Sequence, residues 1–528
     1  MKKILFIIFS SITAMNVQAQ EPADALRYSW YVPGGTARVK AVGGAMGSLG
    51  GDITATFVNP AGIAFFRTGD FLISPNYQFR NTSGRYLDNK EKSKGDKFTW
   101  GTTGLVLGGG QEGRNVRNTS FSIAYNRTAD FNSDILYRGI NHQSSYSQKF
   151  LEEIQRNGDK DANVVSGNLD VNDPRYNASY ANGTSLAFNT YWIDTVGGST
   201  NGNFQFQSRA QNILASGLIQ QNRVNTRGGI DEFALGLAVN LKDKIMIGGS
   251  IGVPILHFRK TTEFIEADAT QNTNNQFNYA IVDETLRTTG VGFNLKAGVI
   301  YKPSEFWRLG LAIHSPSFFV LNDEYDVSIT TDRDRPDSVL SDYSIDYNNG
   351  SPAEFKYDHF TPYRVMGSVS YVIREIQDVT KQRGFLTADV EYVNYKASSF
   401  SPHEDENTVT DAGTKAYLKQ LNKAIDKAYK GAFNFRVGGE LKFTTVMVRL
   451  GAAYYGNPYK NINGEKGSKL NLSGGLGYRN KGFFIDATYV HAINKDVQFA
   501  YRLANGPYYG ANIKNTTGQV YLTIGVKI

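Results

Sequence analysis

The last ten residues of the chain alternate between apolar side chains and polar or small ones. Val520, Leu522, Ile524, Val526 and Ile528 share one face of an extended strand, and Tyr521, Thr523, Gly525 and Lys527 share the other. This period of two predicts a strand with one face in an apolar medium. A soluble β-sandwich can end in such a strand. So can a membrane barrel, whose last strand must pair with its first to remove the open edge.

The same alternation recurs along the chain from Phe71 onward. About fourteen segments have the length that a tilted strand needs to cross a bilayer. The pattern is clear at Phe433–Phe443 and poor at Phe98–Leu107. The segments centre on Phe71–Phe79, Phe98–Leu107, Ser120–Thr128, Glu232–Leu241, Ile245–Phe258, Val291–Tyr301, Trp307–Ser315, Tyr363–Arg374, Phe385–Tyr395, Phe433–Phe443, Val446–Tyr455, Leu470–Arg479, Phe483–Ile493 and Gln519–Ile528.

The connections between these segments alternate in length. Short ones span 108–114, 242–244, 302–305, 373–384, 444–445 and 480–482, and long polar ones span 80–97, 129–231, 260–288, 316–360, 396–430, 456–468 and 494–516. Outer-membrane barrels sort short turns and long loops to opposite sides, whereas a soluble sandwich has no reason to do so. We therefore predict an all-β, antiparallel transmembrane barrel over residues 71–528. Its even strand number would place both barrel ends on the same side, and with the short turns inside, that side is the periplasm.

The N-terminal part of the chain does not share this pattern. Lys2 and Lys3 precede the short apolar run Ile4–Ile12, and Val17-Gln18-Ala19 fits a cleavage site, so residues 1–19 are predicted to be a signal peptide. Residues 20–70 are rich in Gly and Ala and contain the turn signal Asn59-Pro60-Ala61-Gly62. We predict that this compact segment is a hatch inside the barrel.

Two of the long loops contain helical patterns. Residues 414–430 place Leu418, Leu421, Ile425 and Ala428 near helical spacing, and residues 147–157 show a weaker pattern of the same kind. Each helix could cap the outer mouth by burying its own apolar stripe, or it could offer a shelf to an apolar ligand.

The composition fits a barrel better than a soluble protein. The chain has 31 Tyr and 32 Phe, yet its mean hydropathy is −0.37. Aromatic girdles combined with a polar lumen and polar loops produce such values. The net charge of +7 is scattered without a long basic run, so we expect no nucleic-acid binding. The chain has no cysteine, which excludes disulfides and thiolate chemistry.

Signals of catalysis are weak. The six histidines show no metal-ligand spacing, and Gly108-Gly109-Gly110 opens no helix that could hold a phosphate. Serine, histidine and acidic residues are common, but a catalytic triad must be shown in space. We predict no enzymatic activity, no cofactor and no metal site.

Three stretches resemble the FadL/OmpP1/TodX family of outer-membrane transporters for hydrophobic molecules. The first runs from Gly44-Ala45-Met46 through Asp52 to Phe57-Val58-Asn59-Pro60-Ala61-Gly62 and is similar to the family's hatch. The second is Trp307-Arg308-Leu309-Gly310-Leu311-Ala312 followed by Ser315-Pro316. The third is Arg436-Val437-Gly438-Gly439-Glu440 followed by Val448-Arg449-Leu450-Gly451-Ala452-Ala453-Tyr454.

The resemblance implies a fourteen-stranded barrel plugged by an N-terminal hatch. In that case Asn59, Pro60, Ala61 and Gly62 would take part in gating; the alternative is that they form only a structural turn. The resemblance also implies that a cargo binds at the outer surface and leaves sideways into the bilayer, through a window opened by a kink in the third strand. The corresponding stretch of this chain is Asn126, Arg127, Thr128, Ala129, Asp130 and Phe131.

Basic residues on the predicted inner face could hold the carboxylate of an amphiphile. The candidates are Arg364, Arg436, Lys442, Arg449 and Arg479. The alternative for each of them is an ion pair in the lumen with a neighbour such as Glu440, Asp389 or Glu391.

The barrel pattern together with the resemblance predicts a passive channel of the Gram-negative outer membrane for hydrophobic or amphiphilic small molecules, and the resemblance implies a cargo of the long-chain fatty acid type. Its partners would be that ligand and the surrounding membrane lipid. Two alternatives stay open. One is a related barrel whose long loops bind or shuttle an exported protein, and the other is a general porin with an open aqueous lumen.

Overall fold

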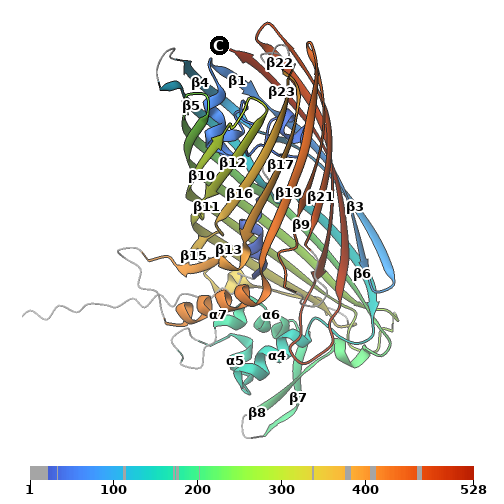
Figure 1. Ribbon diagram of the computed structural model, residues 1–528. Coiled ribbons are helices and arrows are strands. Elements are labelled where there is room, and N and C mark those ends of the chain that lie inside the picture. Colours follow the sequence, from blue (N-terminus) through green and yellow to red (C-terminus); the bar gives the residue numbers. More distant parts are fainter. Residues whose placement is uncertain are drawn as a thin grey trace, which may run out of the picture.

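A computed structural model of the protein describes residues 22–31, 34–110, 115–169, 173, 178–200, 203–270, 272–335, 338–374, 382–404, 412–460 and 467–528. The predicted signal peptide, residues 1–19, lies outside these ranges. The described chain forms a closed antiparallel barrel of fourteen strands, which confirms the predicted fold class (Figure 1). None of the described helices combines the length and the apolar character needed to cross a membrane.

Several of the barrel strands are interrupted and count as two elements. In chain order the barrel strands are β1 (Asp70–Ile73) with β2 (Pro75–Tyr86), β3 (Asn89–Trp100) with β4 (Thr103–Gly110), β5 (Val116–Asp130) with β6 (Ser133–Asn141), β9 (Leu218–Leu241), β10 (Ile245–Asp268), β11 (Tyr279–Tyr301), β12 (Trp307–His314) with β13 (Phe318–Asp332), β15 (Ala353–Phe360) with β16 (Arg364–Arg374), β17 (Gln382–Asn394) with β18 (Ser399–Pro402), β19 (Gly431–Phe443), β20 (Val446–Tyr455), β21 (Lys469–Asn480), β22 (Phe483–Phe499) and β23 (Gly510–Lys527).

The barrel closes where its first and last strands meet. Phe71 pairs with Val526, and Asn76 pairs with Tyr521. The ladder continues past both strand ends, because the amides of Gly69 and Ile528 donate to each other's carbonyls at 3.0 and 2.8 Å. Closure leaves no edge strand at this seam, which is required for β structure surrounded by lipid.

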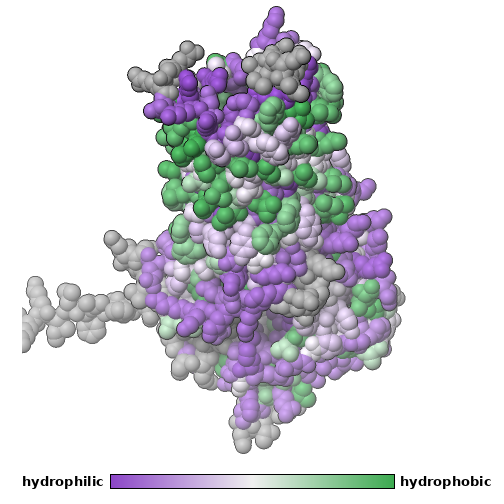
Figure 2. Space-filling view, viewed as in Figure 1, coloured by the Kyte–Doolittle hydropathy of each residue, from purple (hydrophilic) through white to green (hydrophobic). Residues whose placement is uncertain are grey.

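On the face seen in Figure 2, an apolar belt covers the half of the barrel that carries the short turns, and the surface toward the long loops is mostly hydrophilic. Along β9 the outward side chains of Phe233, Leu235 and Leu237 are 53%, 50% and 57% exposed, while inward Ala234 and Ala238 are buried. An exposed apolar band that alternates with a buried inner face is typical of a surface in contact with lipid.

Several segments that we predicted as loops are strands instead. β2 and β3 occupy most of 80–97, β10 and β11 take up much of 260–288, β13, β15 and the short β14 (Leu340–Tyr343) occupy most of 316–360, and β22 and β23 extend into 494–516. The prediction was wrong there because the outer face of these extensions carries polar side chains instead of the apolar ones that mark a membrane strand. The inner face still carries apolar side chains, and Phe264 of β10 and Val282 of β11 are buried in the core at the long-loop end.

Residues 142–217 fold into a compact unit at the long-loop end, which we call the loop subdomain. It contains α4 (Gln148–Asn157), α5 (Ala162–Ser166), η2 (Ala178–Asn182), α6 (Thr184–Asn189), the hairpin of β7 (Ile193–Thr200) and β8 (Asn203–Ser208), and η3 (Ala210–Ile213). Its buried core includes Tyr146, Phe150 and Trp192. α4 confirms the predicted helix at 147–157, and α7 (Ala412–Ala428) confirms the one at 414–430. η4 (Ser344–Tyr347) and η5 (Tyr395–Ala397) complete the loops at this end.

A buried carboxylate at the long-loop end of β10 supports the loop subdomain. Glu266 accepts hydrogen bonds from Ser145 Oγ, from Tyr146 N at 3.0 Å and from Gln220 Nε2 at 2.7 Å. Burial raises the pKa of Glu266 from 4.5 to about 7. The native state therefore keeps a proton that the unfolded state releases. The resulting stabilisation is fully present below about pH 4.5 and is lost as the pH rises through about 7.

We therefore expect the loop subdomain to open more readily at about pH 8 than at about pH 5.5, by on the order of 2 kcal/mol. Hydrogen exchange corrected for intrinsic rates measures this difference, with the amides of β20 and β21 as an internal control. Glu266→Gln removes the titration and keeps the shape, so the pH difference should largely disappear. An unchanged difference in the variant would show that another group is responsible.

Candidate functional site

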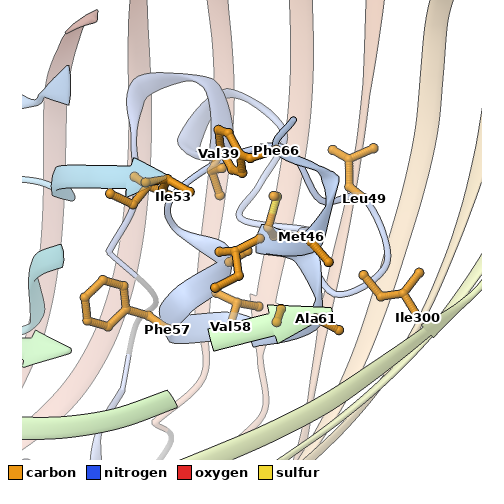
Figure 3. Close-up of a cluster of buried hydrophobic side chains, with 14 of the residues drawn as sticks. Val39, Met46, Leu49, Ile53, Phe57, Val58, Ala61, Phe66 and Ile300 are labelled. Atoms are coloured by element: carbon orange, nitrogen blue, oxygen red, sulfur yellow. The ribbon is translucent and has the colours of Figure 1, made fainter. Parts of the chain in front are cut away.

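Residues 34–69, which we call the N-terminal segment, fold inside the barrel near its short turns (Figure 1). The segment contains α2 (Ala37–Ala41), α3 (Ala55–Val58) and η1 (Pro60–Phe65). Figure 3 shows how its apolar side chains converge with a wall residue. The labelled members are Val39, Met46, Leu49, Ile53, Phe57, Val58, Ala61 and Phe66 from the segment and Ile300 from β11.

Hydrogen bonds attach this segment to several wall strands. The amide of Ala37 donates to Thr523 Oγ1 at 2.7 Å, and its carbonyl accepts from Thr488 Oγ1 at 2.6 Å. From β10, Ser250 Oγ donates to the carbonyl of Thr56 at 2.8 Å. Buried backbone groups without strand partners are satisfied in this way.

Asn59 joins two parts of the segment and lies against the wall. Its Nδ2 donates to the carbonyl of Gly47 at 2.6 Å, and its Oδ1 accepts from the amide of Ala61 at 3.2 Å, which caps η1. A Cβ on wall residue Gly298 would lie 1.9 Å from this oxygen. Glycine at that position is therefore required for the close approach. Pro60, Ala61 and Gly62 are buried within η1.

Arg436 and the carboxylates beside it form one buried cluster. Its guanidinium lies 2.8 Å from Glu391 and 3.9 Å from Asp389. Asp389 also accepts from the amides of Met46 and Gly47 at 2.9 and 3.1 Å. The same charges that pair across the wall therefore hold the backbone of the N-terminal segment.

Arg449 is paired in a similar way. It lies 2.6 Å from Glu440 and 2.5 Å from Asp486, and Arg38 of the N-terminal segment approaches Glu440 at 3.8 Å. Both Arg436 and Arg449 thus take part in lumen ion pairs, the alternative that the sequence left open.

The other basic candidates are separate from these clusters. Arg364 is buried; it donates to the carbonyl of Ser29, and its guanidinium lies 4.8 Å from the Tyr31 ring centroid. Arg479 is half-buried against Phe484 at 5.2 Å. Lys442 is exposed next to the short turn at 444–445, so the structure does not bring it together with the buried arginines.

An aromatic cluster around α1 (Pro22–Ser29) was not predicted from the sequence. Tyr28 donates to Thr288 Oγ1 at 3.0 Å, and its ring lies 6.1 Å from that of Phe131 and 6.2 Å from that of Phe258. Further members are Phe319, Tyr357, Tyr395 and Phe400, with Leu418, Leu421 and Ile425 of α7 beside them. The inward positions of Phe258 and Phe319 were a sequence signal that could have indicated this cluster.

The space between α1 and the wall is small. A cavity of about 40 Å³ is lined by Tyr28, Tyr31, His314 and Arg364 and by the buried ion pair of Lys296 with Glu232. It has room for about one water molecule, whereas sites for small organic ligands usually measure several hundred Å³. A wider groove of about 840 Å³ lies at the surface between α7 and β18.

The third barrel strand is interrupted at Phe131 and Asn132. The register of β5 against β9 shifts between Arg127 and Ala129, and the chain resumes as β6. Among the described residues, β3 pairs with β2 alone and β6 with β9 alone. A gap in the ladder, which we call the wall break, therefore separates β3 from the stretch Asn126–Ser133 and from β6, which continues it.

Polar side chains bridge the wall break instead of a backbone ladder. Thr102 Oγ1 donates to Asn126 Oδ1 at 3.0 Å, Lys97 Nζ donates to Asn132 Oδ1 at 2.8 Å, and Gln78 Nε2 donates to Asp130 Oδ2 at 2.9 Å. On the outer side Arg127 pairs with Asp231 at 3.1 Å. The other members of the predicted stretch, Thr128, Ala129 and Phe131, are buried.

The fold is similar to that of solved outer-membrane proteins. A FadL homologue of Pseudomonas aeruginosa is 13% identical, with 94% of this chain and 99% of that chain covered and a TM-score of 0.53. The toluene transporters TbuX of Ralstonia pickettii and TodX of P. putida are 12% and 10% identical at the same coverage, with TM-scores of 0.48 and 0.47. No family model matches the chain. No curated protein matches it in sequence. The comparison confirms a FadL-like fold.

Asn59→Ala should loosen the N-terminal segment while the barrel stays closed. The change removes the cap of η1 and the link to Gly47, which together stabilise by about 1–2 kcal/mol. Hydrogen exchange should accelerate in residues 47–65 and stay unchanged in β19 and β20. Asn480→Ala, at an exposed short turn, is the matched control. Equal protection of residues 47–65 in both variants would show that Asn59 does not hold the segment.

Proposed function

We propose that this protein is a passive outer-membrane channel for hydrophobic or amphiphilic small molecules, which leave it sideways through the wall break. The observation that carries the proposal is the missing ladder between β3 and β6 in an otherwise closed wall. A ladder cannot part without losing several backbone hydrogen bonds, whereas side-chain bridges can exchange partners at lower cost.

The filled lumen supports the same proposal. The N-terminal segment fills the lumen near the short turns, with a shared apolar core and hydrogen bonds to the wall. An open aqueous pore of the porin type does not fit this filling.

The aromatic cluster supplies an apolar surface next to the wall break. Phe131 belongs to both, because it follows the end of β5 and packs on Phe258 with ring centroids 5.6 Å apart. Tyr28 of α1 packs against both rings, so we propose that α1 shifts when a ligand enters. The structural neighbours are described as transporters of toluene and channels for monoaromatic hydrocarbons, which fits an apolar cargo.

Arg364 is the residue that we propose for binding an acidic head group. Arg436 and Arg449 each already lie beside two carboxylates. Arg364 instead lines the small cavity, and its Nη1 has no hydrogen-bond partner among the described residues. A carboxylate placed there would gain a charge-assisted hydrogen bond. Cargo of the fatty-acid type is therefore part of the proposal.

A disulfide across the wall break should stop transport. The chain has no cysteine, so Thr102→Cys with Asn126→Cys introduces one possible pair, in place of side chains 3.0 Å apart. Oxidation should lower uptake of a fluorescent fatty acid and of toluene by at least about tenfold, because the ladder gap can no longer widen. Reduction should restore uptake.

The control is a disulfide within a continuous ladder. Ala453→Cys with Asn471→Cys joins residues paired directly between β20 and β21. Uptake should not respond to oxidation in this variant. If the oxidised pair at the wall break transports normally, the cargo takes another path and lateral release is wrong.

The loop subdomain favours a second candidate function, in which the protein binds or shuttles an exported protein. Residues 142–217 form a cored unit at the long-loop end, separate from the wall break. Such a unit is larger than a channel mouth needs, and loops on a rigid scaffold often carry binding functions.

Removal of the loop subdomain separates the two functions. Asn141 and Leu218 are direct cross-strand partners, so a short hairpin turn can replace residues 142–217. We expect the shortened protein to fold and to retain at least about half of its uptake, because the wall break stays intact. Uptake assays in cells and heat-modified gel mobility measure both outcomes. Folded protein without any uptake would place the loop subdomain in the transport path.

A further inference from the structure

Three arginines face one another on the outer wall of the barrel. Arg259 of β10 pairs directly with Arg227 of β9 and, on its other side, with Arg287 of β11. All three side chains are exposed, and the neighbouring inward residues Phe258 and Leu286 are buried. We call these three residues the arginine row.

Like charges directly opposite each other destabilise a sheet. Among the described residues, the counter-charges lie at the β13 end of the arginine row. Glu324 lies 3.7 Å from Arg287, and the charge of Arg259 opposes the rise that burial causes in the pKa of Asp326. Arg227 donates to the carbonyl of Thr226 at 3.3 Å. Within the described residues, no carboxylate lies at ion-pair distance from Arg227 or Arg259. The arginine row therefore carries a net positive charge.

The arginine row lies just beyond the apolar belt. The outward positions of β10 that lead up to Arg259 are Val253, Ile255 and His257. Val253 is 41% exposed, and Ile255 pairs with Val291 of the belt. Four residues of a strand span about 13 Å, and strand tilt reduces this to a height of about 10 Å above Ile255. That is the depth at which lipid head groups begin, since they flank the hydrocarbon core.

We propose that the arginine row binds the phosphate groups of an anionic lipid in the leaflet at the long-loop end. Guanidinium forks match phosphate oxygens, and a phosphate between two paired arginines turns their repulsion into attraction. The row also adjoins the wall break, because Thr226 Oγ1, beside Arg227, donates to the carbonyl of Phe131 at 2.5 Å. A bound lipid would therefore stand beside the proposed exit. The inference depends on the barrel lying in a membrane and not on its cargo.

The triple variant Arg227→Gln, Arg259→Gln, Arg287→Gln tests this site. Native mass spectrometry of the full-length mature protein in a zwitterionic detergent would measure binding of diphosphorylated lipid A and of its dephosphorylated form. Wild-type protein should prefer the phosphorylated lipid, and the triple variant should bind it at least about tenfold more weakly. The preference should weaken with salt.

The matched control is Lys419→Gln, Lys423→Gln, Lys427→Gln, which removes the same charge from exposed positions of α7. It should keep the wild-type preference. Without anionic lipid, the triple arginine variant should resist thermal unfolding at least as well as wild type, because repulsion has been removed. Equal lipid binding by wild type and the triple variant, or an equal loss in the control, would overturn the proposal. Full competition by millimolar inorganic phosphate would overturn the assignment to a lipid.

Discussion

Backbone hydrogen bonding in an apolar medium is the constraint on which the structure depends. A wall that faces lipid has no water to satisfy its amides and carbonyls, so each strand must find a partner on both sides. The pairing of β23 with β1 and β2 meets this requirement at the seam. The wall break is the exception, and there Thr102, Lys97 and Gln78 donate hydrogen bonds across the gap.

The lumen is organised by buried charge. Asp389 accepts from Met46 and Gly47 and also lies beside Arg436, so the wall and the N-terminal segment share one electrostatic cluster. Loss of one partner would leave an uncompensated buried charge, which is far more destabilising than loss of a surface pair. The buried ion pairs therefore hold the N-terminal segment to the wall, whereas Tyr28 of α1 contacts Phe131 and Phe258 through its ring. The proposed lateral exit requires movement in this second part, next to the wall break.

The sequence predicted the barrel because lipid imposes a strict alternation on every strand that it contacts. The same reasoning placed Arg436 and Arg449 on the inner face and named Asp389, Glu391 and Glu440 as possible partners, but which carboxylate meets which arginine depends on the order of β17, β19 and β20 in the wall. Asp486, the other partner of Arg449, was not named because it comes from β22, on the far side of β21. Lys442 has the same parity as Arg436, yet it is exposed at the rim, because alternation gives the face of a residue and not its depth. The aromatic cluster depends on how α1 packs against the wall, and the interruption at Phe131 depends on how β3 separates from the third barrel strand. Neither is a property of one local stretch.

The seam between β1 and β23 has a consequence for biogenesis. Ser74 Oγ and Thr523 Oγ1 share a hydrogen bond of 2.8 Å although they are 449 positions apart in the chain. Contacts of such separation form late. Nearly the whole polypeptide must therefore be available before the barrel can close, and until then two long strand edges stay open to pairing with other chains.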